Sequence, residues 1–366
     1  MNIANVFDFQ KISKENISQM AYDYINGGSQ DELTLNRNRN AFKKIKVKQF
    51  VLRDVDTIDT SHQVLGEKIP FPIMLAPISL HRLSHPEGEL ATARAAHKLD
   101  TIMILSSLSS TSLEDVAAAA SGRKWFQLYW MSNKEVTKNI VDRAETNGYS
   151  AIVLTVDAPV LGKREKDVYN EFSLPEGIEL MNYQGLDQAF LPDTGSTGGS
   201  GLAQYVMAQF NSALTWKDLD WLTSLTNLPI LIKGVQTTQD AKLAVDYGMQ
   251  GVIVSNHGGR QLDGSLSSIE CLPRVTEAIK GEIEILLDSG VRRGSDVFKA
   301  IALGATSTVI GRPYIWGLGA AGEEGIQQVF EILRSEFEET MGLTGVSSVA
   351  DITREYLEEK TIPDFS

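Results

Sequence analysis

The sequence of 366 residues has only one cysteine, Cys271, and five histidines. A single cysteine excludes an internal disulfide framework and a cysteine-rich zinc site. It suits a reducing compartment, and we expect a cytoplasmic protein. His81 and His85 have the spacing of a helical metal-ligand pair, but Pro86 interrupts the helix and only Glu87 lies nearby. The sequence therefore predicts no metal site.

Long apolar segments are also missing. No stretch approaches the ~18 uncharged apolar residues of a membrane span. The first segment, MNIANVFDFQKISKEN, lacks the pattern of a secretory signal, and the last, TIPDFS, lacks a peroxisomal Ser-Lys-Leu tripeptide. We expect no membrane partner.

Basic residues are scarce relative to acidic ones, with 34 Lys and Arg against 47 Asp and Glu and a net charge of −13. Binding a nucleic-acid backbone needs a basic face, so no nucleic-acid partner is expected. Binding of a small anion remains compatible with this net charge, because an acidic surface can enclose a locally positive pocket.

The remaining composition is that of an ordinary globular protein, with 42% hydrophobic and 22% charged residues, and it predicts a sizeable core. Eight short apolar runs recur along the chain: FPIMLAP (71–77), TIMILSS (101–107), WFQLY (125–129), AIVLTVD (151–157), PILIKG (229–234), GVIVSNHGG (251–259), EILLDSG (284–290) and STVIGRP (307–313). Continuous rather than alternating hydrophobicity is typical of parallel strands buried on both faces.

Helical segments lie between most of these runs, at 87–99, 112–120, 133–148, 237–248, 267–281 and 294–304. Strands alternating with helices predict a (β/α)₈ TIM barrel, within one domain of residues 1–366. An open doubly wound sheet is the alternative, but the chain lacks a GxGxxG turn after the first strand.

Two regions fall outside the strand and helix repeat. Residues 1–70 form an N-terminal extension, helical around ISQMAYDYING, that would cap the barrel bottom or fold over its mouth. Residues 158–215 form a long insertion after the fourth strand, with the glycine-rich run LPDTGSTGGSGL. We interpret the insertion as a partly mobile lid.

Polar residues follow almost every predicted strand, and in a TIM barrel the strand ends carry the chemistry. The residues at the strand ends, polar apart from Pro77 and Gly311, are Pro77, Ser106, Gln127, Tyr129, Thr155, Asp157, Lys233, Ser255, His257, Asp288, Gly311 and Arg312. After the seventh and eighth strands, VRRGSDV and GRP combine glycines, arginines and a helix start, which favours a phosphate site there. The alternative is that Arg292, Arg293 and Arg312 are ordinary solvated arginines.

Two residues at strand ends suggest reactive roles. Lys233 ends a buried strand and requires an anionic or polar partner, which could be a reduced flavin, a Schiff-base carbonyl or a plain ion pair. His257 lies in SNHGGRQ, with Arg260 close behind it. This order places a base, His257, beside an arginine that can bind a carboxylate. The alternative is that the histidine is purely structural.

At SNHGGRQ the chain resembles the FMN-dependent α-hydroxy acid oxidase and dehydrogenase family, which includes glycolate oxidase and lactate oxidase. The resemblance extends in order through YDYINGG, LAPISLHRLSHPEGELATARAA, WFQLYW, LTVDAPVLGKRE, LPILIKG, LDSGVRRGSDVFKAIALGA and IGRP. It implies oxidation of a small L-2-hydroxy acid to the 2-oxo acid, with FMN as cofactor and O₂ reduced to H₂O₂. It also implies a homo-oligomer, a tetramer or octamer.

The resemblance also implies roles for individual residues. Tyr24, Arg260 and Arg164 would hold the substrate carboxylate, Tyr129 its hydroxyl, and His257 would be the base with Asp157 as its partner. FMN would be bound by Pro77, Ile78, Ser79, Ser106, Gln127, Thr155, Lys233, Ser255, Asp288, Ser289, Gly290, Arg292, Gly311 and Arg312. Two mechanisms remain open. Either His257 removes the hydroxyl proton while hydride passes from Cα to the flavin, or it removes the Cα proton. Hydride transfer is favoured because an unactivated α-hydrogen is a weak acid.

Departures from the family pattern bear on the substrate. Plant-type glycolate oxidases have tryptophan where this chain has Leu108 and threonine where it has Ile78. The smaller residue at position 108 leaves room for the methyl group of lactate, so we expect L-lactate to be preferred over glycolate. The alternatives are a glycolate oxidase, a dehydrogenase with another electron acceptor, a Schiff-base aldolase using Lys233, and a barrel that binds a phosphorylated ligand without catalysis.

Overall fold

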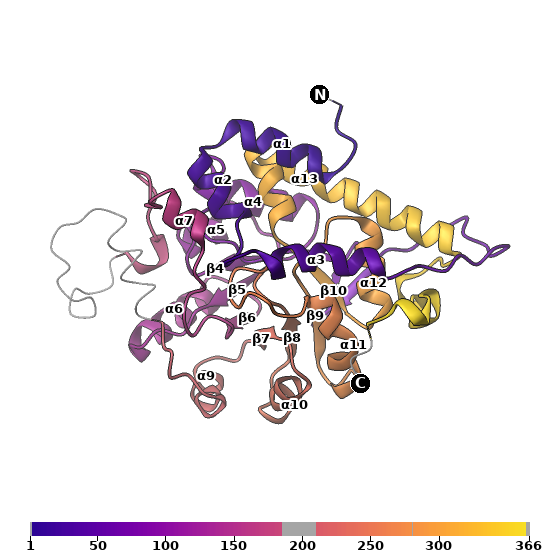
Figure 1. Cartoon of the computed structure of the whole chain (residues 1–366). Coiled ribbons are helices and arrows are strands. Elements are labelled where there is room, and N and C mark those ends of the chain that lie inside the picture. Colours follow the sequence, from indigo (N-terminus) through magenta and orange to yellow (C-terminus); the bar gives the residue numbers. More distant parts are fainter. Residues whose placement is uncertain (1, 185–209, 280, 364–366) are drawn as a thin grey trace.

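The computed structural model describes residues 2–184, 210–279 and 281–363. Eight parallel strands form a closed barrel, and helices surround it (Figure 1). The (β/α)₈ TIM barrel predicted from the sequence is therefore confirmed.

Each of the eight predicted apolar runs overlaps a barrel strand, and the bounds differ by a few residues. The strands are β3 (Ile73–Leu75), β4 (Met103–Ser106), β5 (Lys124–Leu128), β6 (Ile152–Thr155), β7 (Ile230–Val235), β8 (Gly251–Val254), β9 (Glu284–Leu287) and β10 (Ser307–Ile310). Each strand pairs with its neighbours in chain order, and β10 closes the ring onto β3. Nearly every strand residue is buried, as continuous hydrophobicity predicts.

Helices follow all eight strands. They are α4 (Gly88–Lys98), α5 (Leu113–Ala119), α6 (Lys134–Thr146), α9 (Leu219–Leu225), α10 (Thr238–Asp246), α11 (Ser268–Ile279), α12 (Gly294–Ala302) and α13 (Arg312–Thr344). Six of them lie at the predicted places, whereas α9 and α13 were not predicted. Ser112 and Thr237 cap α5 and α10 with their side-chain oxygens, which satisfies amides that the first helical turn leaves free. No helix in the described part of the chain is long and apolar enough to cross a membrane.

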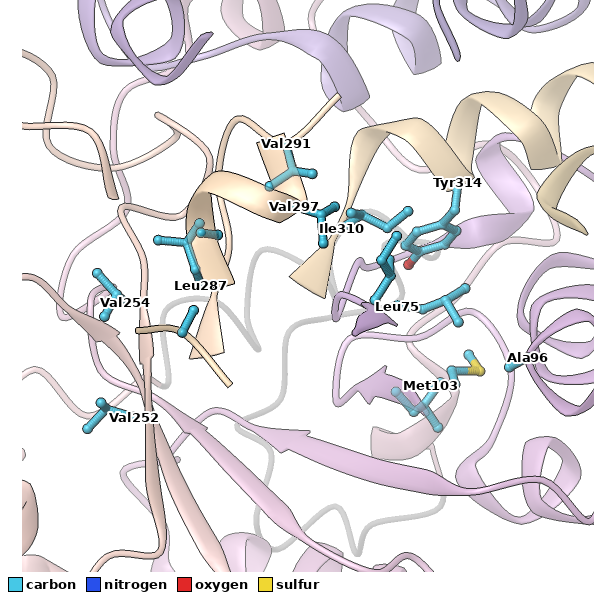
Figure 2. Close-up of a cluster of buried hydrophobic side chains, with 14 of the residues drawn as sticks. Leu75, Ala96, Met103, Val252, Val254, Leu287, Val291, Val297, Ile310 and Tyr314 are labelled. Atoms are coloured by element: carbon cyan, nitrogen blue, oxygen red, sulfur yellow. The ribbon is translucent and has the colours of Figure 1, made fainter. Parts of the chain in front are cut away.

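The hydrophobic core has two layers, because alternate strand residues point into and out of the ring. One residue of each strand belongs to an inner cluster: Met74, Ile104, Trp125, Val153, Leu231, Ile253, Leu286 and Val309. Outward-facing residues pack against the helices. Figure 2 shows Leu75 and Met103 near Ala96 of α4, with Ile310 and Tyr314 beside them.

The N-terminal extension covers both ends of the barrel. A hairpin not predicted from the sequence, β1 (His62–Val64) with β2 (Glu67–Ile69), buries Val64 and Ile69 against the inner cluster at the bottom. At the other end, α1 (Val6–Asn16) lies along α13 (Figure 1), while α2 (Gln19–Asn26) and α3 (Leu33–Lys44) reach the mouth.

The insertion after β6 is more ordered at its start than expected. Its described part contains α7 (Glu165–Tyr169) and a short 3₁₀ helix, η2 (Met181–Tyr183). These elements were not predicted from the sequence, and α7 packs against α2 of the extension. The run LPDTGSTGGSGL, on which the lid interpretation depended, lies outside the described residues.

Candidate active site

A cavity at the mouth of the barrel gathers most of the residues singled out from the sequence. It lies at the carboxyl ends of the strands, where side chains from separate loops converge. Of the candidate site residues, the following line the cavity: Tyr24, Pro77, Ile78, Ser79, Ser106, Leu108, Tyr129, Lys233, His257, Arg260, Asp288, Ser289, Gly290, Arg292, Gly311 and Arg312.

The other candidates stand behind the cavity wall and contact it. Ser106 Oγ donates to Gln127 Oε1 over 3.1 Å, and Gln127 Nε2 donates to Thr155 Oγ1 over 2.9 Å. Lys233 Nζ donates to Ser255 Oγ over 3.1 Å. These contacts form a hydrogen-bonded polar wall along neighbouring strands, from β4 to the end of β8.

His257 is paired with Asp157 at the end of β6. The distance between His257 Nδ1 and Asp157 Oδ1 is 2.8 Å. A carboxylate at Nδ1 favours the tautomer that carries its proton there, which leaves Nε2 as the basic nitrogen. Nε2 faces the cavity, 3.5 Å from the hydroxyl oxygen of Tyr129.

Burial keeps His257 neutral and Tyr129 protonated. Burial lowers the pKa of His257, and this effect outweighs the raising influence of Asp157. The pKa of Asp157 is itself lowered, because His257 and Lys233 outweigh the raising effect of its burial. Burial, reinforced by Asp157, raises the pKa of the Tyr129 phenol well above its ordinary value. At neutral pH the site therefore offers a free base and a hydroxyl donor.

Arginines around Tyr24 form a positive region at one end of the cavity. The guanidinium carbon of Arg260 lies 5.0 Å from the centre of the Tyr24 ring, and that of Arg164 lies 5.8 Å from it. Burial and then the neighbouring charge of Arg164 lower the pKa of Arg260. These two partly buried like charges repel each other, so a carboxylate bound beside Arg260 would be stabilised.

Arg164 does not line the cavity itself. It lies against Tyr24 and has a carboxylate partner in the structure, Asp167 Oδ2, 3.6 Å from its Nη1. Arg260 contacts the backbone of the extension instead, donating to the carbonyls of Tyr24 and Gly27. Arg260 is therefore the guanidinium that faces the cavity directly.

Lys233 is buried but remains charged. Its Nζ lies 3.2 Å from Asp288 Oδ2. Burial alone would lower its pKa, but Asp288 and Asp157 outweigh that effect and raise it. A protonated amine is not a nucleophile, so the site provides a fixed positive charge at the centre of the polar wall.

The loop after β9 carries a second positive region. Arg292 is buried, and its guanidinium carbon lies 4.9 Å from the ring centre of Trp316. Its pKa is lowered by burial first and then by the charges of Arg312 and Arg39. Three guanidiniums repelling one another in a buried place are stabilised by a bound dianion such as a phosphate.

The helix starts after β9 and β10 differ from each other in what their backbone amides contact. The backbone amides of Arg292 and Arg293 both donate to Asp296 Oδ2, and that of Gly294 donates to Glu336 Oε2. The first turn of α12 is thus capped by the protein's own carboxylates. The start of α13, with Gly311 and Arg312, lines the cavity and is the one open to an anion.

Arg312 also has a structural task. It donates to the carbonyls of Ile25 over 3.0 Å, Gly27 over 2.9 Å and Gly258 over 3.0 Å. These bonds fasten the extension to the loop after β8. A guanidinium has further N–H donors, so an anion in the cavity can share it.

The donor set of this cavity fits FMN. Arg292 and the α13 start suit a phosphate, and Asp288 suits sugar-alcohol hydroxyls. Ser106 and Gln127 provide hydrogen-bonding groups for a polar ring edge, and Lys233 provides a positive charge there. In the described residues no group of three or more His, Cys, Asp or Glu side chains is placed to hold a metal ion.

Two contributors were missed in the sequence. The ring of Phe210 stacks on Tyr129 with centres 4.4 Å apart, and it follows directly after the undescribed segment 185–209. Arg39 of α3 donates to the carbonyl of Gly290 and pairs with Asp296. A single aromatic residue at the end of an insertion and an arginine on a polar helix give no pattern that would single them out.

A bulge in β7 brings its backbone close to Asp157. The register shifts between Lys233 and Val235, and Gly234 between them has a φ of 116°. A Cβ atom at Gly234 would lie 2.6 Å from Cβ of Asp157, far below a van der Waals contact. Only glycine lets β7 pass this close to the acid behind His257.

Comparison with known proteins agrees with this geometry. The family model described as FMN-dependent dehydrogenase matches residues 13–359. Glycolate oxidase 3 of Arabidopsis thaliana is 49% identical over 98% of this chain and 96% of its own length. Glycolate oxidase 1 of Zea mays is 48% identical, over 97% of this chain and 95% of its own length.

Solved structures agree as well. A mandelate oxidase with (S)-4-hydroxymandelic acid is 39% identical and superimposes with a TM-score of 0.90, over 97% of this chain and 98% of that one. The chain therefore belongs to the family of FMN-dependent dehydrogenases, and FMN is its cofactor.

Proposed function

We propose that this protein is an oxidase of small L-2-hydroxy acids that prefers L-lactate over glycolate. Each turnover would convert the 2-hydroxy acid and O₂ into the 2-oxo acid and H₂O₂. The observation that carries the proposal is the neutral His257, paired with the Asp157 carboxylate, facing the same cavity as the guanidinium of Arg260. A base and an anion-binding group in one cavity are what a hydroxy acid requires.

The side chains divide the work as follows. Arg260, with Arg164 behind Tyr24, holds the substrate carboxylate. His257 Nε2 accepts the hydroxyl proton of the substrate, and Asp157 stabilises the imidazolium that results. Tyr129 orients that hydroxyl group as a neutral donor. FMN, when bound, supplies the two-electron acceptor, and Lys233 provides the positive charge that favours its reduction.

The Schiff-base aldolase alternative is not favoured. That chemistry requires a neutral lysine amine, but Asp288 and Asp157 raise the pKa of Lys233. A barrel that binds a phosphorylated ligand without catalysis would have no use for the paired base at His257.

The preference for lactate depends on the pocket wall at Leu108. Leu108 lines the cavity and is 5% exposed, so its size directly limits the space for a substrate side chain. A methyl group in an apolar pocket contributes about 1 to 3 kcal/mol. Glycolate is the second candidate, because the relatives at 48 to 49% identity are named glycolate oxidases.

The first test uses the colour of the purified protein. We expect a yellow flavin spectrum that bleaches when L-lactate is added without O₂, and peroxide formation when O₂ is present. Rates with L-lactate, D-lactate and glycolate then rank the substrates. A yellow protein that no 2-hydroxy acid bleaches would contradict the proposed oxidation, and a colourless protein trapped by borohydride with a carbonyl substrate would favour the aldolase.

A second test addresses the side-chain pocket. Leu108→Trp should lower the ratio of kcat/KM for L-lactate to that for glycolate by about 5- to 160-fold, since a methyl group is worth about 1 to 3 kcal/mol. Leu108→Met, which nearly conserves volume, is the control and should leave the ratio close to that of the wild type. Steady-state peroxide production measures both variants. An unchanged ratio in the tryptophan variant would show that position 108 does not set the preference.

A further inference from the structure

A buried carboxylate outside the active site lies between two of the loops that form it. Glu89, in the first turn of α4, has no exposed surface. In the described part of the chain no ion pair includes it. Burying a carboxylate without a cation is expensive, so its hydrogen bonds have to be numerous and well placed.

Those hydrogen bonds come from both loops. Glu89 Oε1 accepts from the backbone amide of His81 over 3.1 Å and from that of Ser110 over 2.8 Å. Oε2 accepts from the hydroxyls of Ser110 over 2.7 Å and Thr111 over 2.9 Å. His81 belongs to the loop after β3, while Ser110 and Thr111 belong to the loop after β4. The carboxylate therefore joins the two loops directly.

The same loops touch each other on the side nearer the cavity. The amide of Leu80 donates to the carbonyl of Leu108 over 3.2 Å, and the amide of Arg82 donates to Ser110 Oγ over 3.1 Å. The first of these bonds fixes the backbone of Leu108, the proposed specificity residue. Ser79, next to Leu80, lies 2.7 Å from the hydroxyl of Tyr24, measured between the two oxygens.

We propose that Glu89 is a positioning residue that sets the width of the substrate pocket by holding the loops after β3 and β4 together. Without its acceptor oxygens, two buried amides lose their partners and the loops can separate. Leu108 and Ser79 would then move, and with them the walls around Tyr24. The proposal rests on the proposed function, because it names what controls selectivity at that same cavity.

The test compares Glu89→Leu with Glu89→Gln. A glutamine keeps one oxygen for the two amides, and its NH₂ group can donate to the two hydroxyls, so it should preserve the bridge. Leucine has a similar volume and no acceptor. We expect Glu89→Leu to change the lactate to glycolate ratio of kcat/KM by at least about 5-fold and Glu89→Gln to stay within about 2-fold of wild type.

A binding measurement keeps this inference separate from turnover. Oxalate, a small dianion shaped like the substrate carboxylate and its neighbouring oxygen, can be titrated against the visible spectrum of the FMN-bound enzyme. Glu89→Leu should raise the oxalate Kd by about 10-fold, since small displacements of a binding wall have large effects. If the wild type oxidises neither lactate nor glycolate, the proposed function fails, while the oxalate Kd still tests Glu89.

Glu270 provides a control at a second buried carboxylate. It too accepts from a serine amide and hydroxyl, those of Ser267, at 2.9 Å and 2.7 Å, but unlike Glu89 it also pairs with an arginine, Arg37, whose Nε lies 2.6 Å from Oε2. It does not line the cavity. Glu270→Leu should lower the Tm but leave the oxalate Kd and the substrate ratio unchanged. Loss of selectivity in this variant as well would overturn a specific role for Glu89.

Milder variants keep the inference testable if Glu89→Leu does not fold. Thr111→Val removes one hydroxyl donor, and Ser110→Ala removes one donor together with the acceptor of the Arg82 amide. Each should shift the oxalate Kd by about 2- to 13-fold, the value of one hydrogen bond. An unchanged oxalate Kd in a folded, FMN-bound Glu89→Leu enzyme, or in both milder variants, would overturn the proposal. Equal damage from Glu89→Gln and Glu89→Leu would do the same.

Discussion

Replacing His257 by glutamine is expected to slow flavin reduction by L-lactate at least about 100-fold while FMN stays bound, since a positioned base contributes about 10²- to 10⁴-fold. The Nε2 atom of His257 is the basic nitrogen that faces the cavity, because Asp157 holds the other ring nitrogen 2.8 Å away. Glutamine keeps much of the shape but cannot take up a proton. Anaerobic stopped-flow reduction measures the rate, and the visible spectrum shows whether the cofactor is retained.

The pH dependence provides the control for this assignment. Burial lowers the pKa of His257, so the imidazole is neutral at neutral pH and becomes protonated only as the pH falls through that lowered value. We expect kcat/KM of the wild type to be flat near neutrality and to decline on the acid side below pH 6.5, the ordinary pKa of histidine. A variant reduced at close to the wild-type rate, with the same acid limb, would remove His257 from the chemistry.

Replacing Arg260 by methionine is expected to lower kcat/KM for L-lactate by about 30-fold or more, because losing one partner of a buried charge pair costs about 2 to 5 kcal/mol. The loss should appear mainly in KM. Methionine fills much of the space of the arginine stem, but it offers no donor to the substrate carboxylate. Steady-state kinetics and the oxalate Kd measure the effect.

Arg260→Lys is the matched control for the charge. Lysine keeps the positive charge but lacks the planar fork that binds both carboxylate oxygens, so the variant should fall between methionine and wild type. Both variants lose the guanidinium bonds to the Tyr24 and Gly27 carbonyls. The Tm of each variant measures how much stability this loss costs. If both variants bind oxalate as tightly as the wild type, the carboxylate lies elsewhere.

The barrel could be predicted from the sequence because its strands are buried on both faces. A run such as AIVLTVD has no polar alternation to suggest an exposed strand, and β6 within it is fully buried. The hairpin of β1 and β2 could not be predicted, since each of its strands buries only one residue, Val64 or Ile69. Three-residue strands leave almost no pattern.

The residues of the candidate site likewise fall into those that could be predicted from the sequence and those that could not. Residues directly after an apolar run, such as Lys233 and His257, could be singled out because the barrel places every strand end at one mouth. Residues that act from other elements could not. Glu89 looks in the sequence like an ordinary exposed acid in a first helical turn, and Arg39 like a charge on a polar helix. Their importance comes from contacts between segments far apart in the chain.

The bulge at Gly234 has a consequence for engineering. Because any side chain there would collide with the acid behind the base, β7 tolerates almost no variation at this point. Libraries meant to broaden the range of accepted acids should leave this strand alone and randomise positions 78 and 108 on the opposite wall. Since the specificity residues and the catalytic residues lie on different walls, substrate preference could change during evolution while His257 and Asp157 stay in place.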